Sequence, residues 1–267
     1  MPDKILEFNN VSFSYKGRND RETSVLDSLS FHVHSGEIFG LVGPSGCGKT
    51  TILKLAADLV PAPTAGRIAI DGISPAEARA ERRIAILFQR PILLNWRNVI
   101  ENILLPVHIV GSESSQHRQK AKELLALAGM EEFSTYQVHE LSGGMQQRVS
   151  LVRCLMTSPR ILLLDEPFAA LDEILKDELL ALLQGICHDL SLTVVYVSHS
   201  LEDSILFCDR VAVLDPRPTT VSQIVSVPLG RPRTFSDRLE PDFLHSLATL
   251  RTALRQNGMN EEEGQEK

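Results

Sequence analysis

One short segment of the chain has the residue types and the spacing of a loop that binds phosphate. Residues 43–50 read Gly-Pro-Ser-Gly-Cys-Gly-Lys-Thr, which fits the pattern G-x-x-x-x-G-K-S/T. Its glycines permit backbone conformations that a Cβ would block, so several N–H groups can face one anion. An apolar run at 38–42 precedes the loop and a helical run begins at residue 51, whose N-terminus adds partial positive charge. Because all eight positions and both flanks match, we predict a nucleotide-binding loop rather than a glycine-rich turn before an ordinary helix.

Four side chains could carry phosphate chemistry around this loop. Lys49 would reach the β- and γ-phosphates, and the Thr50 hydroxyl would ligate Mg²⁺. Asp165 and Glu166 directly follow the apolar run 161–164, at the end of a predicted parallel strand, where ligands bind in open α/β sheets. Asp165 can hold Mg²⁺, directly or through water, and Glu166 can accept a proton from an attacking water. Without the phosphate loop, Asp-Glu-Pro would be more typical of a helix N-cap region.

A second anion-binding motif lies about 100 residues further along. Residues 141–148 read Leu-Ser-Gly-Gly-Met-Gln-Gln-Arg, so Ser142, Gly143 and Gly144 precede a predicted helix. A helix start of this kind attracts an anion through its free N–H groups. A single nucleotide cannot use both helix starts if they lie far apart in one chain.

With these motifs in place, the sequence resembles the ATP-binding cassette ATPases over residues 5–214. The resemblance implies that ATP and Mg²⁺ are the cofactors and that two cassettes pack head to tail. Each ATP would lie between the phosphate loop of one cassette and the Ser-Gly-Gly signature of the other. The implied nucleotide contacts along the loop are Gly43, Pro44, Ser45, Gly46, Cys47, Gly48, Lys49, Thr50 and Thr51.

The resemblance also implies roles for isolated residues. Tyr15 matches the aromatic residue that stacks on adenine, although a tyrosine could merely close a strand. Asp172 matches a loop that crosses to the partner cassette, and His199 matches the histidine that contacts the γ-phosphate. Gln89 matches a glutamine that contacts Mg²⁺ and water and responds to a transmembrane partner. A solvated glutamine and a structural histidine at strand ends are the alternatives for Gln89 and His199.

The chain departs from the family pattern at two positions near these motifs. Ala169 stands where close relatives usually have glycine, and Ser200 follows the histidine where aspartate is common. Neither departure removes a group that contacts phosphate or metal, so we expect the reaction to be retained.

Composition excludes several other functions. The chain has 267 residues, a net charge of −7 and 43% hydrophobic residues, enough for one large domain with a lobe. No basic segment has interleaved aromatics, so a nucleic-acid partner is not indicated. We find no signal peptide and no run of about 18 apolar residues, and therefore predict no membrane span. The scattered cysteines 47, 154, 187 and 208 favour reduced cytosolic thiols, the last three as core residues.

Hydrophobic periodicity and the resemblance together predict an α/β fold. We expect a nucleotide-binding core of the RecA-like type at 1–89 and 158–215, with an antiparallel β subdomain at its N-terminus. An α-helical subdomain would be inserted at 90–157, and a C-terminal extension would cover 216–257. A last helix should begin at Pro241, with Phe243, Leu244, Leu247, Leu250 and Leu254 on one side and Gly258 beyond its end. We expect the acidic tail 258–267 to be disordered.

Segments outside the shared motifs indicate the kind of cassette. Residues 91–106 and 136–145, with Arg217-Pro218 and 231–233, resemble ATPases of nitrate, sulfonate and taurine importers. The expected partners are a second ATPase subunit, as a homodimer, membrane permease subunits and, indirectly, a solute-binding protein, at the cytoplasmic face of the membrane. Trp96 would either line a groove for the permease or pack inside the helical lobe.

Three alternatives remain open. They are a soluble cassette that acts on DNA or ribosomes, a cassette for lipid or lipoprotein extraction, and a non-enzymatic nucleotide-binding adaptor. Nitrate, sulfonates, taurine and small vitamin precursors all remain possible solutes, because the cassette does not touch the solute.

Overall fold

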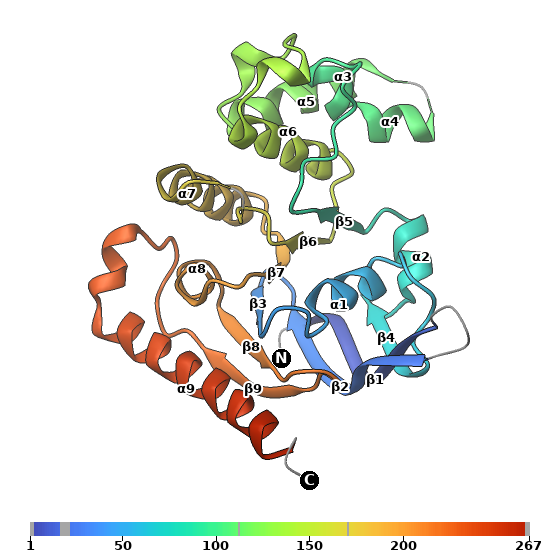
Figure 1. Ribbon diagram of the computed structural model, residues 1–267. Helices are drawn as coiled ribbons and strands as arrows, with labels where there is room; N and C mark the ends of the chain where they lie inside the picture. The colour runs from blue at the N-terminus through green and yellow to red at the C-terminus, as the bar shows by residue number, and fades with distance from the viewer. Residues whose placement is uncertain (1–2, 17–21, 112, 170, 265–267) are drawn as a thin grey trace.

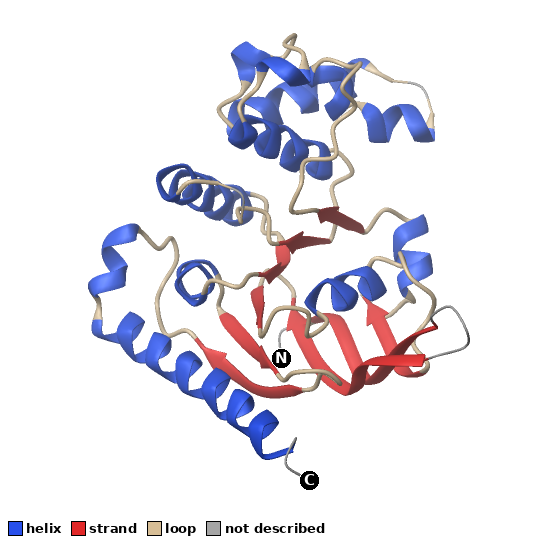
Figure 2. Cartoon of the chain, viewed as in Figure 1, coloured by secondary structure: helices blue, strands red, loops and turns tan. Residues whose placement is uncertain are grey.

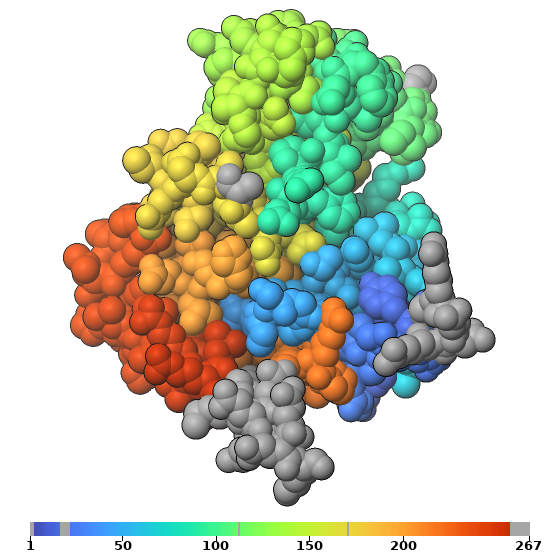
Figure 3. All heavy atoms as spheres, viewed as in Figure 1, coloured from blue at the N-terminus to red at the C-terminus, as the bar shows by residue number. Residues whose placement is uncertain are grey.

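The computed structural model describes residues 3–16, 22–111, 113–169 and 171–264. It consists of an α/β core and a helical lobe that stands on top of it (Figure 1). The space-filling view shows this lobe as a distinct green body above the core (Figure 3). The predicted fold, a phosphate-loop core with an inserted helical subdomain, is therefore confirmed.

The core is built on a six-stranded sheet in which the strands that carry the motifs lie side by side. The strand order is β5-β6-β7-β3-β8-β9, and only β9 runs antiparallel to its neighbour. The bounds are β5 Ile84–Leu87, β6 Ile161–Asp165, β7 Thr193–Val197, β3 Ile38–Val42, β8 Arg210–Leu214 and β9 Val221–Ser226. The central strands β3, β6 and β7 are buried along their whole length, as continuous apolar runs predict for a sheet covered on both faces.

Alternate residues of β3 supply the two halves of the core. Phe39 and Leu41 pack with helix α1 (Lys49–Ala56) and the N-terminal sheet. Ile38 and Val42 face the opposite side and pack with helices α7 (Glu173–Asp189), α8 (Leu201–Phe207) and α9 (Pro241–Gly264). Both faces of this sheet are therefore covered by packed elements (Figure 2).

A smaller antiparallel sheet covers the α1 side, as the resemblance implied. Its order is β2-β1-β4, with β1 Lys4–Lys16, β2 Glu22–His34 and β4 Ala65–Ile70. Phe31 stacks between Phe8 and Phe39, with ring centroids 4.6 and 5.3 Å apart, which joins this sheet to β3. The short helix α2 (Pro75–Ala80) follows β4, and Ser74 closes its capping box.

The inserted lobe is helical between residues 99 and 155. Its elements are α3 Val99–Ile103, α4 Leu105–Val110, α5 Ser115–Leu127, η1 Glu131–Phe133, η2 Val138–Glu140 and α6 Gly143–Leu155. Apolar residues of these helices are buried inside the lobe, namely Val99, Ile103, Leu104, Ala121, Leu124, Leu125 and Ala128. Gly129 follows α5 with a φ of 64°, the left-handed conformation typical of a residue that ends a helix.

The C-terminal extension packs back on the core through β9, η3 (Phe235–Leu239) and α9. Helix α9 begins at Pro241 as predicted, and Phe243, Leu247 and Leu250 are buried. Two details of the prediction are wrong: Leu244 is 53% exposed, because it lies off the buried stripe, and the helix continues past Gly258 to Gly264. The predicted disorder of the acidic tail stays a prediction, and residues 265–267 lie outside the described residues.

Within the described ranges, every helix is too short or too polar to cross a membrane.

Candidate active site

The phosphate loop connects β3 to α1 and turns through two left-handed glycines. Gly46 and Gly48 have φ values of 76° and 126°, which side chains with a Cβ rarely adopt. Lys49 Nζ donates hydrogen bonds to the carbonyl oxygens of Gly43 at 2.8 Å and Pro44 at 2.9 Å. These contacts hold the ammonium group within the curve of the loop, while Ser45 on its outer face is exposed.

Two predicted magnesium ligands lie in contact. The Thr50 hydroxyl donates to Asp165 Oδ1 at 3.0 Å, although 115 residues separate them in sequence. Burial raises the pKa of the Asp165 carboxyl, an effect that the Thr50 hydrogen bond opposes and the nearby Glu166 charge reinforces. A hydroxyl and a carboxylate are ligands that Mg²⁺ accepts when phosphates and waters complete its shell. The described residues contain no group of three or more His, Cys, Asp or Glu placed to hold a metal.

Glu166 and His199 meet across neighbouring strands. Glu166 follows β6, His199 lies just beyond β7, and His199 Nδ1 is 3.2 Å from Glu166 Oε2. Glu166 has a φ of 46°, and its backbone N–H donates to the Val197 carbonyl oxygen at 3.0 Å. Both side chains line a small cavity of about 90 Å³. A carboxylate and an imidazole at the end of the sheet can together orient and deprotonate a water.

The signature residues stand on the helical lobe at the start of α6. Ser142 caps this helix, because its hydroxyl accepts a hydrogen bond from the Met145 N–H at 3.3 Å. Ser142 and Gly143 are exposed, whereas Gly144 is buried against α7. A Cβ at Gly144 would lie 2.5 Å from Leu175 Cδ2, so a larger residue here would require the Leu175 side chain to shift.

Three further predicted residues surround these groups. The Tyr15 hydroxyl lies 3.4 Å from Thr51 Oγ1, and the Tyr15 ring is 37% exposed beside the start of α1. Gln89 is exposed just after β5. Asp172 caps α7, since its Oδ1 accepts a hydrogen bond from the Leu175 N–H at 3.0 Å.

One residue that the sequence motifs did not single out connects these parts. Gln147, on α6, is 3% exposed, and its Nε2 donates to the carbonyl oxygens of Phe88 at 3.2 Å and Pro167 at 2.8 Å. Phe88 precedes Gln89, and Pro167 follows Glu166. The signal was present, because Gln147 lies within the signature run, but its partners are 59 and 20 residues away.

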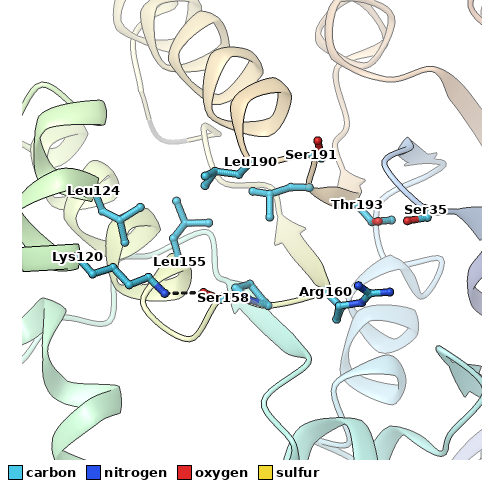
Figure 4. A pocket seen from close by; sticks show the side chains of 11 residues that line it. Ser35, Lys120, Leu124, Leu155, Ser158, Arg160, Leu190, Ser191 and Thr193 are labelled. Carbon is cyan, nitrogen blue, oxygen red and sulfur yellow. Dashed lines mark hydrogen bonds between the residues drawn. The ribbon is translucent and has the colours of Figure 1, made fainter. Parts of the chain in front are cut away.

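The structure thus brings Lys49, Thr50, Asp165, Glu166 and His199 to one end of the sheet. The signature lies in the other lobe (Figure 1). A larger cavity of about 280 Å³ opens at the opposite ends of the strands and contains none of these residues. There Lys120 Nζ donates to Ser158 Oγ at 2.5 Å and to the Met156 carbonyl oxygen at 2.9 Å (Figure 4).

Comparison with known proteins identifies the chain. The family described as ABC transporter matches residues 26–169. The taurine import ATP-binding protein of Rhizobium johnstonii is 36% identical over 93% of this chain and 100% of its own, and that of Ruegeria pomeroyi is 35% identical over 84% and 82%.

Solved structures agree with these sequence relatives. The cbiO1 protein of Clostridium perfringens, part of the cbiONQ transporter complex, has a TM-score of 0.75 at 25% identity and covers 84% of this chain and 89% of its own. A dimeric ATP-binding cassette with ADP and Pi bound has a TM-score of 0.73 at 30% identity, with 84% and 100% covered.

The fold and the site define a phosphate-loop enzyme that binds and hydrolyses a nucleoside triphosphate. More narrowly, the chain belongs to the ABC transporter family, as an ATP-binding cassette with ATPase activity.

Proposed function

We propose that this protein is the ATP-hydrolysing subunit of an ABC importer, and that two copies of it close around two ATP molecules. The exposure of Ser142 and Gly143 at a helix start carries this proposal. A helix start that faces solvent, away from its own phosphate loop, is free to bind the γ-phosphate held by a second copy. The dimeric cassette with ADP and Pi bound supports the same arrangement.

In this proposal each residue of the nucleotide site has a role that is compatible with the contacts described above. Lys49 and the loop N–H groups hold the phosphates, and His199 stabilises charge on the γ-phosphoryl group. Thr50 and Asp165 hold Mg²⁺, which neutralises charge on the phosphate oxygens when bound. Glu166 accepts the proton of the attacking water, and Gln89 lies at the strand end from which it can reach the metal and the water. Tyr15 stacks on the base, and Asp172 reaches toward the partner copy.

Glu166→Gln tests this proposal, because it keeps the side-chain shape but removes the base. The variant should bind ATP and form a dimer on size-exclusion chromatography with ATP, while its turnover falls by about 10²–10⁴-fold. Glu123→Gln is the matched control, since Glu123 lies exposed on α5 and bonds only to Gln119 in the described structure. Turnover of Glu166→Gln at the wild-type rate would show that the base is wrongly assigned.

An apolar groove between the core and the helical lobe supports docking of a permease. This groove, of about 360 Å³, is lined mainly by Ile84, Ile86, Phe88, Ile92, Leu94, Leu105 and Ile109. Trp96 is 77% exposed, so the alternative that it packs inside the lobe is wrong. A helix from a membrane permease fits an apolar groove of this kind. The protein would then sit at the cytoplasmic face of the membrane and receive solute through the permease from a binding protein.

The resemblance of residues 91–106 and 136–145 favours a solute of the nitrate, sulfonate or taurine type, and the names of the import proteins favour taurine. Copurification with membrane permease subunits tests the partner. The solute is tested by ATPase activity of that complex with its binding protein and, in turn, taurine, an alkanesulfonate and nitrate. Acceleration by one of them identifies the solute. Failure of the protein to copurify with any permease would favour a soluble cassette instead.

A further inference from the structure

A charged network connects the C-terminal extension to the helices that start at the active site. Arg238, in η3, is 14% exposed at its side chain. Its Nη2 lies 3.4 Å from Asp177 Oδ1, and its Nη1 lies 3.7 Å from Glu173 Oε1. Glu173 and Asp177 are one helical turn apart at the start of α7, and Glu173 directly follows Asp172. The extension therefore reaches the first turns of α7.

The same network reaches the start of α8. The Asp203 side chain is 5% exposed, with Lys176 Nζ at 3.2 Å and Arg238 Nη2 at 3.9 Å from its Oδ1. The Asp203 backbone N–H donates to Ser200 Oγ at 3.2 Å, and Ser200 caps α8 immediately after His199. Two cations from different elements thus converge on one buried carboxylate beside the histidine.

This network borders the proposed catalytic groups without containing them. The cavity of about 90 Å³ that holds Glu166 and His199 is also lined by Lys176 and Asp203. A shift of α7 or α8 would therefore move Asp172 or His199 relative to Glu166. Nothing in the hydrolysis chemistry itself requires Arg238.

Charge, more than apolar packing, holds η3 in place. The Arg238 guanidinium lies 3.7 Å from the centroid of the Phe235 ring, and Phe235 is itself 51% exposed. Between this segment and α7 lies a cavity of about 180 Å³, lined in part by Asp177 and Phe235. Removal of Arg238 would leave three neighbouring carboxylates with Lys176 as their nearest cation, and like charges at this spacing repel.

We propose that Arg238 is a positioning residue for ATP hydrolysis. By bridging the first turns of α7 and α8, it sets the places of Asp172 and His199, so the C-terminal extension controls the rate without touching nucleotide. This inference rests on the proposed roles of Asp172 and His199. Because the phosphate loop lies on other elements, ATP binding by a single copy should not depend on Arg238.

Arg238→Gln tests the proposal on the full-length protein. We expect kcat to fall about five- to tenfold, since small displacements of catalytic groups are costly, while ATP affinity stays within about twofold of wild type. Arg238→Lys should recover most of the rate, because it restores the positive charge. Arg251→Gln is the matched control: Arg251 also links the extension to α8, through Glu202 at 3.7 Å, but this pair is solvent-exposed and should leave kcat unchanged.

The outcomes separate this inference from the proposed function. Wild-type kcat in Arg238→Gln, or an equal loss in Arg251→Gln, overturns the positioning role while loss of turnover in Glu166→Gln still supports the ATPase mechanism. If Arg238→Gln does not fold, the double variant Arg238→Gln/Asp177→Asn is compared with the single variant Asp177→Asn. The double variant has less charge repulsion than Arg238→Gln, because it neutralises one unpaired carboxylate. The double variant should be at least about threefold slower, and equal rates would overturn the inference.

Discussion

At the residue scale, the site depends on side chains that the fold brings into contact from distant parts of the chain. Thr50 and Asp165 are hydrogen-bonded across 115 residues, and Glu166 and His199 across 33. Each of these residues lies at or beyond the C-terminal end of a parallel strand in the same sheet, so their meeting follows from strand order. Single substitutions at these positions should therefore affect chemistry more than folding.

Lys49→Ala should weaken ATP binding by about 10- to 100-fold, because it removes charge-assisted hydrogen bonds to phosphate. Isothermal titration with ATP measures the change. Lys4→Ala is the control, since Lys4 is half-exposed on β1 and pairs only weakly with Glu7 at 3.5 Å. Normal ATP affinity in Lys49→Ala would remove the proposed role of the phosphate loop.

The cysteines should react slowly with alkylating reagents in the folded protein. Burial raises the pKa of Cys154 to about 11 and that of Cys187 to about 12. At pH 8 only about one Cys154 thiol in a thousand is then the reactive thiolate. Mass spectrometry after iodoacetamide treatment should show little labelling until guanidinium unfolds the chain. Rapid labelling of folded Cys154 would contradict this.

At the element scale, a serine caps the start of both α5 and α6, but the surroundings of the two helix starts differ. Ser142 and Ser114 each accept a hydrogen bond from a backbone N–H and so cap α6 and α5. Only the start of α6 carries exposed glycine beside the serine and packs against α7 through Gly144. The same local capping chemistry therefore stabilises both helices, and we propose that the start of α6 also binds nucleotide.

Comparison of Ser142→Ala with Ser114→Ala separates these two effects. Both should lower the free energy of unfolding by about 1 kcal/mol, because each removes a cap. Only Ser142→Ala should also weaken ATP-dependent dimerisation, measured in the Glu166→Gln background by analytical ultracentrifugation. An equal effect of both substitutions on dimerisation would show that Ser142 acts only as a cap.

At the scale of the whole molecule, the C-terminal extension is anchored by one buried arginine. Arg233 is 3% exposed and donates to the carbonyl oxygens of Ile205, Cys208 and Leu229. Burial lowers its pKa, an effect that the charge of Asp209 opposes. Because Arg233 donates hydrogen bonds to carbonyl groups at the C-terminal end of α8, it joins β9 and α9 to the core that carries His199.

Arg233→Ala should lower the free energy of unfolding by about 3 kcal/mol, because buried carbonyl groups lose a charged donor. Urea denaturation followed by circular dichroism measures this change. Arg231→Ala should cost less than about 1 kcal/mol, since Arg231 pairs with Asp209 at 3.1 Å with its side chain 31% exposed. Equal losses in the two variants would contradict the anchoring role of Arg233.

Local patterns in the sequence were enough to predict the phosphate loop, the apolar strands beside it and the start of the last helix. Each of these depends on residues within a few positions of one another, such as the run 43–50 or the apolar run 161–164. Family resemblance added the roles of Tyr15, Gln89, Asp172 and His199, which remain proposals.

Only the tertiary structure decided which distant side chains meet. Gln147 bonds to Phe88 and Pro167, Arg238 bridges α7 and α8, and Trp96 faces solvent rather than the interior of its lobe. Hydrophobic periodicity shows which face of a helix is buried, but it does not show which polar group of another element that face will approach. Pairings across dozens of residues arise from strand order and lobe packing, and so became visible only in the folded chain.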